Sequence, residues 1–231
     1  MSTPRAVFFD VDFTLIYPGP TFDGAGYRSF AERHGIRVDP SRFAEAVVNA
    51  SAELDAAQDQ IYRPELFVRY ARRVIERMGG EGVGLDPCAW EIYEEWAACQ
   101  HFALYDDVVS VMRALYEADV RIGLISNTHR CLTSFQSHFE LEPFITAAVS
   151  SSGHGYMKPH PSIFEAALRL VGVEARDAVM VGDSLTQDIN GARGVGMRAV
   201  LLARSGAPAA IDPDVPVIQT LLELPALLID G

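Results

Sequence analysis

Two aspartates one residue apart, Asp10 and Asp12, follow an apolar stretch near the start of the chain. Carboxylates this close repel each other and resist joint ionisation unless a cation or hydrogen-bond donors compensate them. Mg²⁺ suits this role, because it takes oxygen ligands and commonly sits between one or two carboxylates and a substrate phosphate. The pair therefore indicates metal-assisted phosphate chemistry, with an ordinary turn or helix cap as the alternative.

Further polar groups follow three later apolar stretches. They are Ser126 and Asn127 after the first, Lys158 beyond the second, and Asp183 after the third, with Asp188 five residues further on. Each group alone has an ordinary interpretation as a turn former, a solvated lysine or a helix cap. Together they match phosphoryl transfer through an aspartyl intermediate, in which one carboxylate attacks phosphorus, a second handles the leaving-group proton, and cations neutralise the phosphoryl oxygens.

These groups must be positioned by an alternation of strands and helices. The first strand is expected before Asp10, and others over residues 121–125, 145–149, 178–181 and 198–202. Helices are expected up to about residue 118 and over residues 129–139, 161–171 and 185–193. Short apolar strands separated by helices imply an open parallel α/β sheet covered on both faces. Since ligands bind at the carboxyl ends of such strands, the polar groups should converge on one crevice.

A helical block interrupts this alternation. After Pro64, apolar residues recur every four positions, which predicts a helix with one buried face; they are Leu66, Tyr70, Val74 and Met78. Two Asp-Pro pairs, at residues 39–40 and 86–87, predict two further helix starts with the aspartate as N-cap. We predict about four helices in an inserted domain of residues 17–102, within a core of residues 1–16 and 103–231.

The composition narrows the choice of partners. The 231 residues carry a net charge of −12, which argues against a nucleic-acid backbone or an anionic membrane surface as partner. The three cysteines form no C-x-x-C pair, so neither a disulfide framework nor a zinc cluster is indicated. The N-terminus lacks a signal-peptide pattern, and no apolar run approaches the ~20 residues of a membrane span. We expect a reduced, cytoplasmic protein.

Four segments resemble the four motifs of the haloacid dehalogenase-like (HAD) hydrolase superfamily. Residues 10–15 resemble D-x-D-G-T-L, Ser126-Asn127 the second motif, Lys158-Pro159 the third, and residues 182–188 the fourth, G-D-S-x-x-x-D. The resemblance covers essentially the whole chain. It implies a Rossmann-like parallel sheet, the HAD fold, with an inserted helical cap of type 1.

The resemblance also implies catalytic roles. Asp10 would be the nucleophile, and Asp12 the general acid and later the base for water. Ser126 and Lys158 would hold the phosphoryl group, with Asn127 beside them.

A magnesium site is implied in the same way. Asp10 and Asp183 would bind Mg²⁺ through their side chains and Asp12 through its backbone carbonyl. Asp188 and Thr14 would support the site. Asp10 must stay ionised while Asp12 holds a proton, so their environments should split their pKa values.

Two positions bear on specificity. Phe13 stands where the motif has Gly, so it must fit a non-glycine backbone geometry or shift the turn slightly; we hypothesise a small change in specificity. Arg63, in a loop before Pro64, is the candidate to contact the non-reacting anionic part of the substrate. Arg69, Arg72 and Arg73, on or beside the polar side of the helix after Pro64, are interpreted as a solvated face.

The combined interpretation is a Mg²⁺-dependent phosphatase that hydrolyses a small phosphomonoester. A 2-haloacid dehalogenase is an alternative, although such enzymes lack the second aspartate of the first motif, so Asp12 favours phosphorus chemistry. A sugar-phosphate mutase shares the core residues, and a non-catalytic binding or regulatory module is a further alternative. Phosphonate hydrolysis would need a cap lysine, and residues 22–102 contain none. The sequence leaves the substrate and the oligomeric state open.

Overall fold

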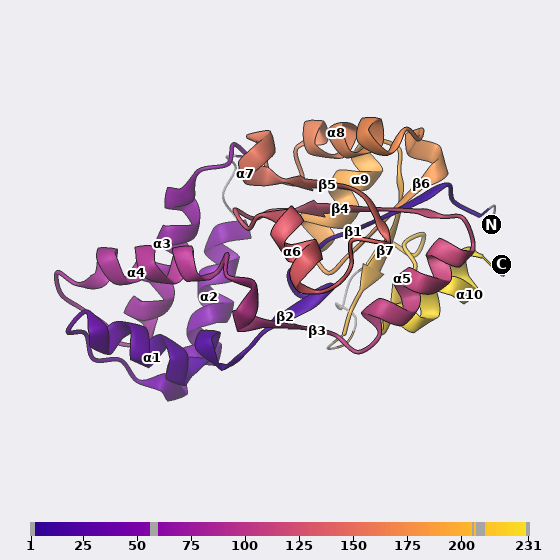
Figure 1. Cartoon of the computed structure of the whole chain (residues 1–231). Coiled ribbons are helices and arrows are strands. Elements are labelled where there is room, and N and C mark those ends of the chain that lie inside the picture. Colours follow the sequence, from indigo (N-terminus) through magenta and orange to yellow (C-terminus); the bar gives the residue numbers. More distant parts are fainter. Residues whose placement is uncertain (1–2, 56–59, 205, 207–210, 230–231) are drawn as a thin grey trace. The chain divides into compact units, whose positions relative to one another are not determined.

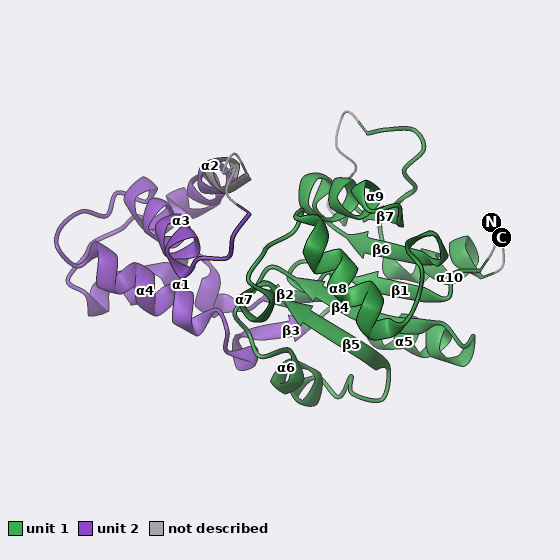
Figure 2. Ribbon diagram, turned by 90° about the horizontal axis from the view of Figure 1, so that it is seen from above, with its two compact units in different colours: residues 1–17, 104–231 green, residues 18–103 purple. Residues whose placement is uncertain are grey.

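The chain divides into two compact units. The computed structural model describes residues 3–55, 60–204, 206 and 211–229. Unit 1 comprises Met1–Tyr17 and Leu104–Gly231, and unit 2 comprises Pro18–Ala103 (Figure 2). Both junctions lie one residue beyond the boundaries expected from the sequence.

Unit 1 is built on a six-stranded sheet in the order β5-β4-β1-β6-β7-β8 (Figure 1). Its strands are β1 (Ala6–Phe9), β4 (Arg121–Ser126), β5 (Ile145–Ser150), β6 (Ala178–Gly182), β7 (Arg198–Leu202) and β8 (Val217–Ile218). Every pair of neighbours is parallel. The predicted parallel α/β fold is confirmed, and β8 is an additional strand of two residues.

Helices cover both faces of this sheet. On one face lie α8 (Pro161–Val171) and α9 (Gly191–Gly194), and on the other α5 (Val108–Glu117) and α10 (Leu224–Leu228) (Figure 1). Phe8 of β1 packs into the apolar cluster on the α8 face, together with Ile163, Phe164 and Met180. Because β1 is buried on both faces, all four of its residues are apolar, and apolar and polar residues do not alternate along it.

The other helices of unit 1 are short. They are α6 (Leu132–His138), α7 (Ser151–His154), the 3-10 helices η4 (Ala175–Asp177) and η6 (Leu221–Glu223), and the π-helix η5 (Leu185–Asn190). The helix expected over residues 129–139 is therefore shorter than predicted. The helix expected over residues 185–193 is divided into η5 and α9, because the first part winds wider: the Ile189 N–H donates to the Ser184 carbonyl, five residues back, at 3.2 Å.

Unit 2 contains four α-helices among its described residues. They are α1 (Gly24–Arg33), α2 (Phe43–Asp55), α3 (Pro64–Arg77) and α4 (Leu85–Glu95), with the 3-10 helices η1 (Pro20–Phe22), η2 (Pro40–Arg42) and η3 (Cys99–His101). Of the four apolar residues expected on one face of α3, Val74 and the C-cap residue Met78 are buried, whereas Leu66 and Tyr70 are only partly so.

One of the two predicted helix caps in unit 2 is wrong. Asp39 caps η2, and its carboxylate accepts a hydrogen bond from the Ser41 N–H at 3.0 Å. In contrast, α4 begins at Leu85, so Asp86 lies inside the first turn. The Asp86 carboxylate pairs instead with Arg72 of α3, and the N-cap of α4 is Gly84, without a side-chain hydrogen bond.

Two short strands carry the chain between the units. β2 (Ile16–Pro18) and β3 (Phe102–Leu104) form a two-stranded sheet that the sequence did not predict. On the unit 1 side, the Tyr105 N–H donates to the Leu15 carbonyl at 3.0 Å; on the unit 2 side, the Gly19 N–H donates to the His101 carbonyl at 2.7 Å. Each unit thus holds its two chain ends close together.

The three cysteines are free. None of the helices in the described residues combines the length and the apolar character that a membrane span requires.

Candidate active site

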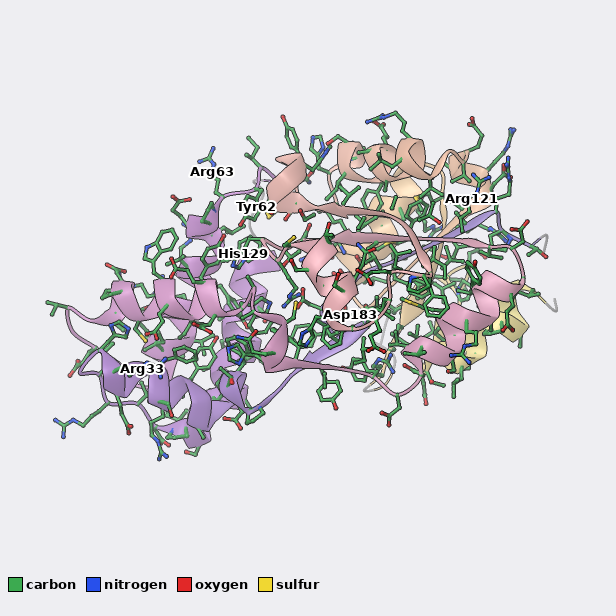
Figure 3. The ribbon with its side chains drawn as sticks, viewed as in Figure 1. Arg33, Tyr62, Arg63, Arg121, His129 and Asp183 are labelled. Carbon is green, nitrogen blue, oxygen red and sulfur yellow. The ribbon has the colours of Figure 1, made fainter. Side chains whose placement is uncertain are left out.

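The register of the central strands brings the predicted acidic residues together. β1 pairs with both β4 and β6, so that Phe9 lies opposite Leu124 and Val181. The Asp10 N–H continues this pairing with a bond to the Val181 carbonyl at 2.9 Å. Asp183 (Figure 3) follows β6 at the same edge of the sheet. The strand order changes direction between β1 and β6, because β4 and β5 lie on one side of β1 whereas β7 and β8 lie beyond β6. Open α/β sheets bind ligands at such a point, outside the carboxyl ends of the strands.

Three carboxylates gather there around one lysine. Side-chain oxygens of Asp10, Asp183 and Asp188 lie within 4.8 Å of one another. The Lys158 ammonium donates to one oxygen of Asp10 and to one of Asp188, at 2.6 Å in each case. Lys158 is only 3% exposed, and both partners are buried. A buried cation held by two carboxylates forms a rigid centre for the site.

The charges in this cluster are unbalanced. Burial alone would lower the pKa of Lys158, but the carboxylates of Asp10 and Asp188 outweigh it and raise that pKa. Loss of hydration and the neighbouring carboxylates raise the pKa of Asp183 to about 8, although the residue as a whole is exposed. Burial and the Asp10 carboxylate likewise raise the pKa of Asp188, against the opposing effect of Lys158. Three carboxylates exceed the charge of one ammonium, so the cluster favours a further cation.

Mg²⁺ fits this set of donors. The cluster offers carboxylate oxygens and neither a thiolate nor an imidazole, and hard divalent cations prefer such ligands. Gly182 is required for the arrangement, because a Cβ atom at that position would stand 2.2 Å from the Asp188 carboxylate. The predicted ligands Asp10 and Asp183 belong to the cluster, and so does Asp188, which was expected only to support the site.

Two buried hydroxyl groups in the same region lack a partner. Neither the Ser126 Oγ nor the Thr14 Oγ1 has a hydrogen-bond partner among the described residues. Leaving a buried hydroxyl unbonded costs about 1–3 kcal/mol, so such groups usually serve a ligand or an ordered water. Ser126 ends β4 and is suited to donate to a phosphoryl oxygen.

The Asn127 side chain connects the backbone of Lys158 to the end of β4 through hydrogen bonds. Its side-chain oxygen accepts from the Lys158 N–H at 2.7 Å, and its amide nitrogen donates to the Lys158 carbonyl at 3.0 Å. The same nitrogen donates to the Gln187 side-chain oxygen at 2.9 Å. Asn127 therefore links the second, third and fourth motifs. Gln187 was not predicted, because it occupies a variable position of the fourth motif.

Asp12 lies apart from the three-carboxylate cluster and has its own partner. One terminal nitrogen of Arg130 donates to both Asp12 carboxylate oxygens, at 3.1 and 3.2 Å. Burial raises the pKa of Asp12, and the Arg130 guanidinium opposes this shift. A raised pKa suits a group that must deliver a proton. Sequence reasoning missed Arg130, which follows the second motif at a position without a pattern of its own.

Phe13 takes a backbone conformation that favours glycine. Its φ angle is +65°, in the left-handed region, and its N–H donates to the Ile16 carbonyl at 2.7 Å. The expectation that Phe13 would use a non-glycine geometry is therefore wrong, and a slight shift of the turn stays a prediction. A bulky residue in this region is strained by about 1–3 kcal/mol. The side chain is 46% exposed, so burial of the ring does not explain the strain.

Arg63 belongs to unit 2, whereas the other predicted site residues belong to unit 1. It is exposed and stands at the N-cap of α3 (Figure 3). Its role as a substrate contact stays a prediction.

Comparisons with known proteins agree with this geometry. The family model of haloacid dehalogenase-like hydrolases matches residues 4–196. Human N-acylneuraminate-9-phosphatase is 30% identical, with 99% of this chain and 95% of the relative covered. Glyceraldehyde 3-phosphate phosphatase of Pyrococcus abyssi is 37% identical over 85% of this chain and 80% of the relative.

The crystal structure of a 2-haloacid dehalogenase from Pseudomonas syringae is 25% identical and superposes with a TM-score of 0.65, covering 98% of this chain and 99% of the other. The chain belongs to the haloacid dehalogenase-like hydrolase family and is an enzyme with its α/β Rossmann-like fold.

Proposed function

We propose that this enzyme is a Mg²⁺-dependent phosphatase that hydrolyses a small phosphomonoester through an aspartyl-phosphate intermediate. The observation that carries the proposal is the buried Lys158 held between Asp10 and Asp188, together with the unpartnered hydroxyl of Ser126 at the end of the strand that pairs with β1. A nucleophile, a fixed cation and a free donor thus lie in one site. Two of the relatives described above are named as phosphatases.

In the first half of the reaction, a carboxylate oxygen of Asp10 attacks phosphorus and the bond from phosphorus to the ester oxygen breaks. Asp12 gives its proton to the departing oxygen, so the leaving group departs as an alcohol. Lys158 and Ser126 neutralise and hold the phosphoryl oxygens. The product of this half is Asp10 as an acyl phosphate, with Asp12 ionised.

In the second half, water attacks phosphorus while the ionised Asp12 takes a proton from it. The bond between phosphorus and the Asp10 oxygen breaks, which releases inorganic phosphate and restores the Asp10 carboxylate. Asp12 is protonated again and ready for the next substrate.

Asp10 and Asp183 would hold Mg²⁺ through their carboxylates and Asp12 through its backbone carbonyl, with Asp188 and Thr14 in support. When bound, the ion neutralises charge on the phosphoryl oxygens. The excess of carboxylates in the cluster supports this assignment.

Unit 2 would serve as the cap that selects the substrate, with Arg63 as its anion contact. Names of the relatives suggest two substrates to try first, N-acylneuraminate 9-phosphate and glyceraldehyde 3-phosphate. We also propose a reducing, cytoplasmic setting, which agrees with three free cysteines.

The test is phosphate release from p-nitrophenyl phosphate, with Mg²⁺ or with EDTA, by the native enzyme and by Asp10→Asn. Metal-dependent release that Asp10→Asn abolishes supports the proposal, and the two candidate substrates are then compared by kcat/KM. Trapping of labelled phosphate on the native chain, but not on Asp10→Asn, tests the intermediate directly.

A dehalogenase is the second candidate, because the Pseudomonas syringae structure shares this fold. Halide release from a 2-haloacid without metal, in the absence of phosphate release, would replace the proposal. Transfer of phosphate to a second hydroxyl of a sugar phosphate would indicate a mutase instead.

A further inference from the structure

Arg130 is a buried charge that the reaction described above does not use. It is 1% exposed and is among the largest fully buried side chains of the chain. A buried guanidinium is costly unless a carboxylate and hydrogen bonds compensate it. The group paired with it is Asp12, the proposed acid and base.

The contact fixes both oxygens of one carboxylate. The terminal nitrogen of Arg130 lies 3.1 Å from one oxygen of Asp12 and 3.2 Å from the other. The Asp12 side chain is 17% exposed while that of Arg130 is 1% exposed. Arg130 therefore holds the carboxyl group from its buried side and is itself shielded from solvent.

Arg130 stands on the loop that begins at Asn127, directly after Ser126 ends β4. Its N–H donates to the Thr128 hydroxyl at 3.0 Å, and the Thr128 carbonyl accepts from the Ser152 N–H at 3.2 Å. Thr128 is itself buried. The loop is thus anchored at Thr128, two residues before the arginine, which restrains Arg130 relative to the end of β4.

We infer that Arg130 is a positioning residue that aims the Asp12 carboxyl group at the ester oxygen of the substrate. This inference rests on the proposed function. Arg130 acts through Asp12, which transfers its proton to the leaving oxygen as the bond from phosphorus to that oxygen breaks. A misaligned acid delays this transfer, while attack by Asp10 on phosphorus is left intact.

Two esters whose leaving groups differ in basicity distinguish a positioning role of Arg130 from a purely structural one. A nitrophenolate departs readily without a proton, whereas a phenolate, which is more basic, needs general-acid assistance. Phenyl phosphate and p-nitrophenyl phosphate have nearly the same shape, so binding affects both alike. Loss of acid positioning should therefore slow phenyl phosphate hydrolysis selectively.

The experiment measures kcat/KM for both esters in the native enzyme, Arg130→Gln, Arg130→Lys and Asp12→Asn. We expect Arg130→Gln to lower kcat/KM for phenyl phosphate about tenfold more than for p-nitrophenyl phosphate, within the range that general acids supply. Arg130→Lys should restore part of the difference. In the Asp12→Asn background, Arg130→Gln should cause no further loss with either ester. Equal losses with the two esters, or additive losses in the double variant, would overturn the inference.

Arg121→Gln is the matched control. Arg121 begins the same strand that precedes Arg130, and its guanidinium donates to the Val171 carbonyl at 2.8 Å. This variant removes an arginine contact of unit 1 at the other end of β4, so it should not change the ratio of the two kcat/KM values. A changed ratio in Arg121→Gln would show that the readout reports general damage, and would overturn the inference.

A crystal structure of Arg130→Gln gives a readout that is independent of turnover. The Asp12 carboxyl group should leave its native orientation or occupy several rotamers, and an unchanged single orientation would overturn the inference. If Arg130→Gln does not fold, Arg130→Lys is used for the same comparison. If the native enzyme hydrolyses neither ester, the proposed function fails, and the crystallographic result alone decides whether Arg130 positions Asp12.

Discussion

Two clusters of unit 1 each place buried carboxylate chemistry beside a cation, one with a single carboxylate and the other with three, and the carboxylates differ in how many hydrogen bonds they accept. Asp107 accepts two hydrogen bonds from Arg204, at 2.8 and 2.9 Å, one from the Thr220 hydroxyl at 2.7 Å and one from the Leu221 N–H at 2.9 Å. These bonds outweigh the effect of burial and lower the pKa of Asp107.

The cluster around Lys158 is the opposite case. Here one ammonium faces the carboxylates of Asp10, Asp183 and Asp188, and the pKa values of the latter two are raised. The unpartnered Ser126 hydroxyl lies at the end of the neighbouring strand. A carboxylate with four hydrogen bonds, such as Asp107, stabilises the fold, whereas an undersatisfied cluster, with more carboxylates than donors, is ready for a ligand.

The largest effects should come from exchanging one carboxylate in each cluster. Asp107→Asn leaves Arg204 without its counter-charge and should lower the free energy of unfolding by about 3–5 kcal/mol. Asp10→Asn removes a charge from an overcrowded site, so we expect less than about 1 kcal/mol of destabilisation but a fall in kcat of about four orders of magnitude or more. Urea unfolding and phosphate release measure both variants. A lower free energy of unfolding in Asp10→Asn than in Asp107→Asn would contradict the assignment of a structural role to Asp107 and a catalytic role to Asp10.

Gly182→Ala should damage the site through packing alone. The added Cβ atom would overlap the Asp188 carboxylate, at 2.2 Å from its oxygen, and displace the partner of Lys158. We expect a loss of about 1–3 kcal/mol in unfolding free energy together with a reduced kcat. Gly194→Ala is the control, because a Cβ there meets nothing within 4 Å. Full activity in Gly182→Ala would mean that Asp188 need not hold its position.

The undersatisfied cluster should make the stability of the metal-free enzyme depend on pH. A carboxyl group whose pKa is higher in the folded than in the unfolded state binds protons on folding, so it favours the folded state increasingly as pH falls. The pKa of Asp183, raised to about 8, places the effect between that value and the ordinary aspartate range. The melting temperature in EDTA should therefore rise as pH is lowered from about 9 to about 6.

Asp183→Asn should flatten this dependence, while Asp107→Asn should leave it in place. Saturating Mg²⁺ should also flatten it, since the cation compensates the ionised carboxylates. An equal dependence in the native enzyme and in Asp183→Asn would contradict the assignment of the effect to this cluster.

The smallest effect concerns Phe13. Glycine at this position relieves the strain of a φ angle of +65° but adds disorder to the unfolded chain, so Phe13→Gly should change stability by less than about 1 kcal/mol. The exposed ring should instead alter selectivity among phosphate esters. Ratios of kcat/KM across several esters measure this, and an unchanged profile would remove Phe13 from the specificity of the enzyme.

Much of unit 1 could be predicted because its signals are local. The apolar runs gave the central strands, and the rule that ligands bind at strand ends brought Asp10, Ser126 and Asp183 to one edge. The contacts of Asn127 and Arg130 could not be predicted, since a side chain that bonds to a segment distant in sequence leaves no periodic pattern. The cap of α4 was mispredicted for a related reason, because Asp86 is used by Arg72 of another helix.

The residues that flank β2 and β3 bear on how this chain could have been assembled. The Leu15 carbonyl and the Tyr105 N–H are bonded on one side of the junctions, and Gly19 and His101 on the other. A segment whose two ends are neighbours can be inserted into a loop, or lost from it, without altering the strand order of the host. The helical unit can therefore be inserted, replaced or removed in a single genetic event without altering the sheet of unit 1.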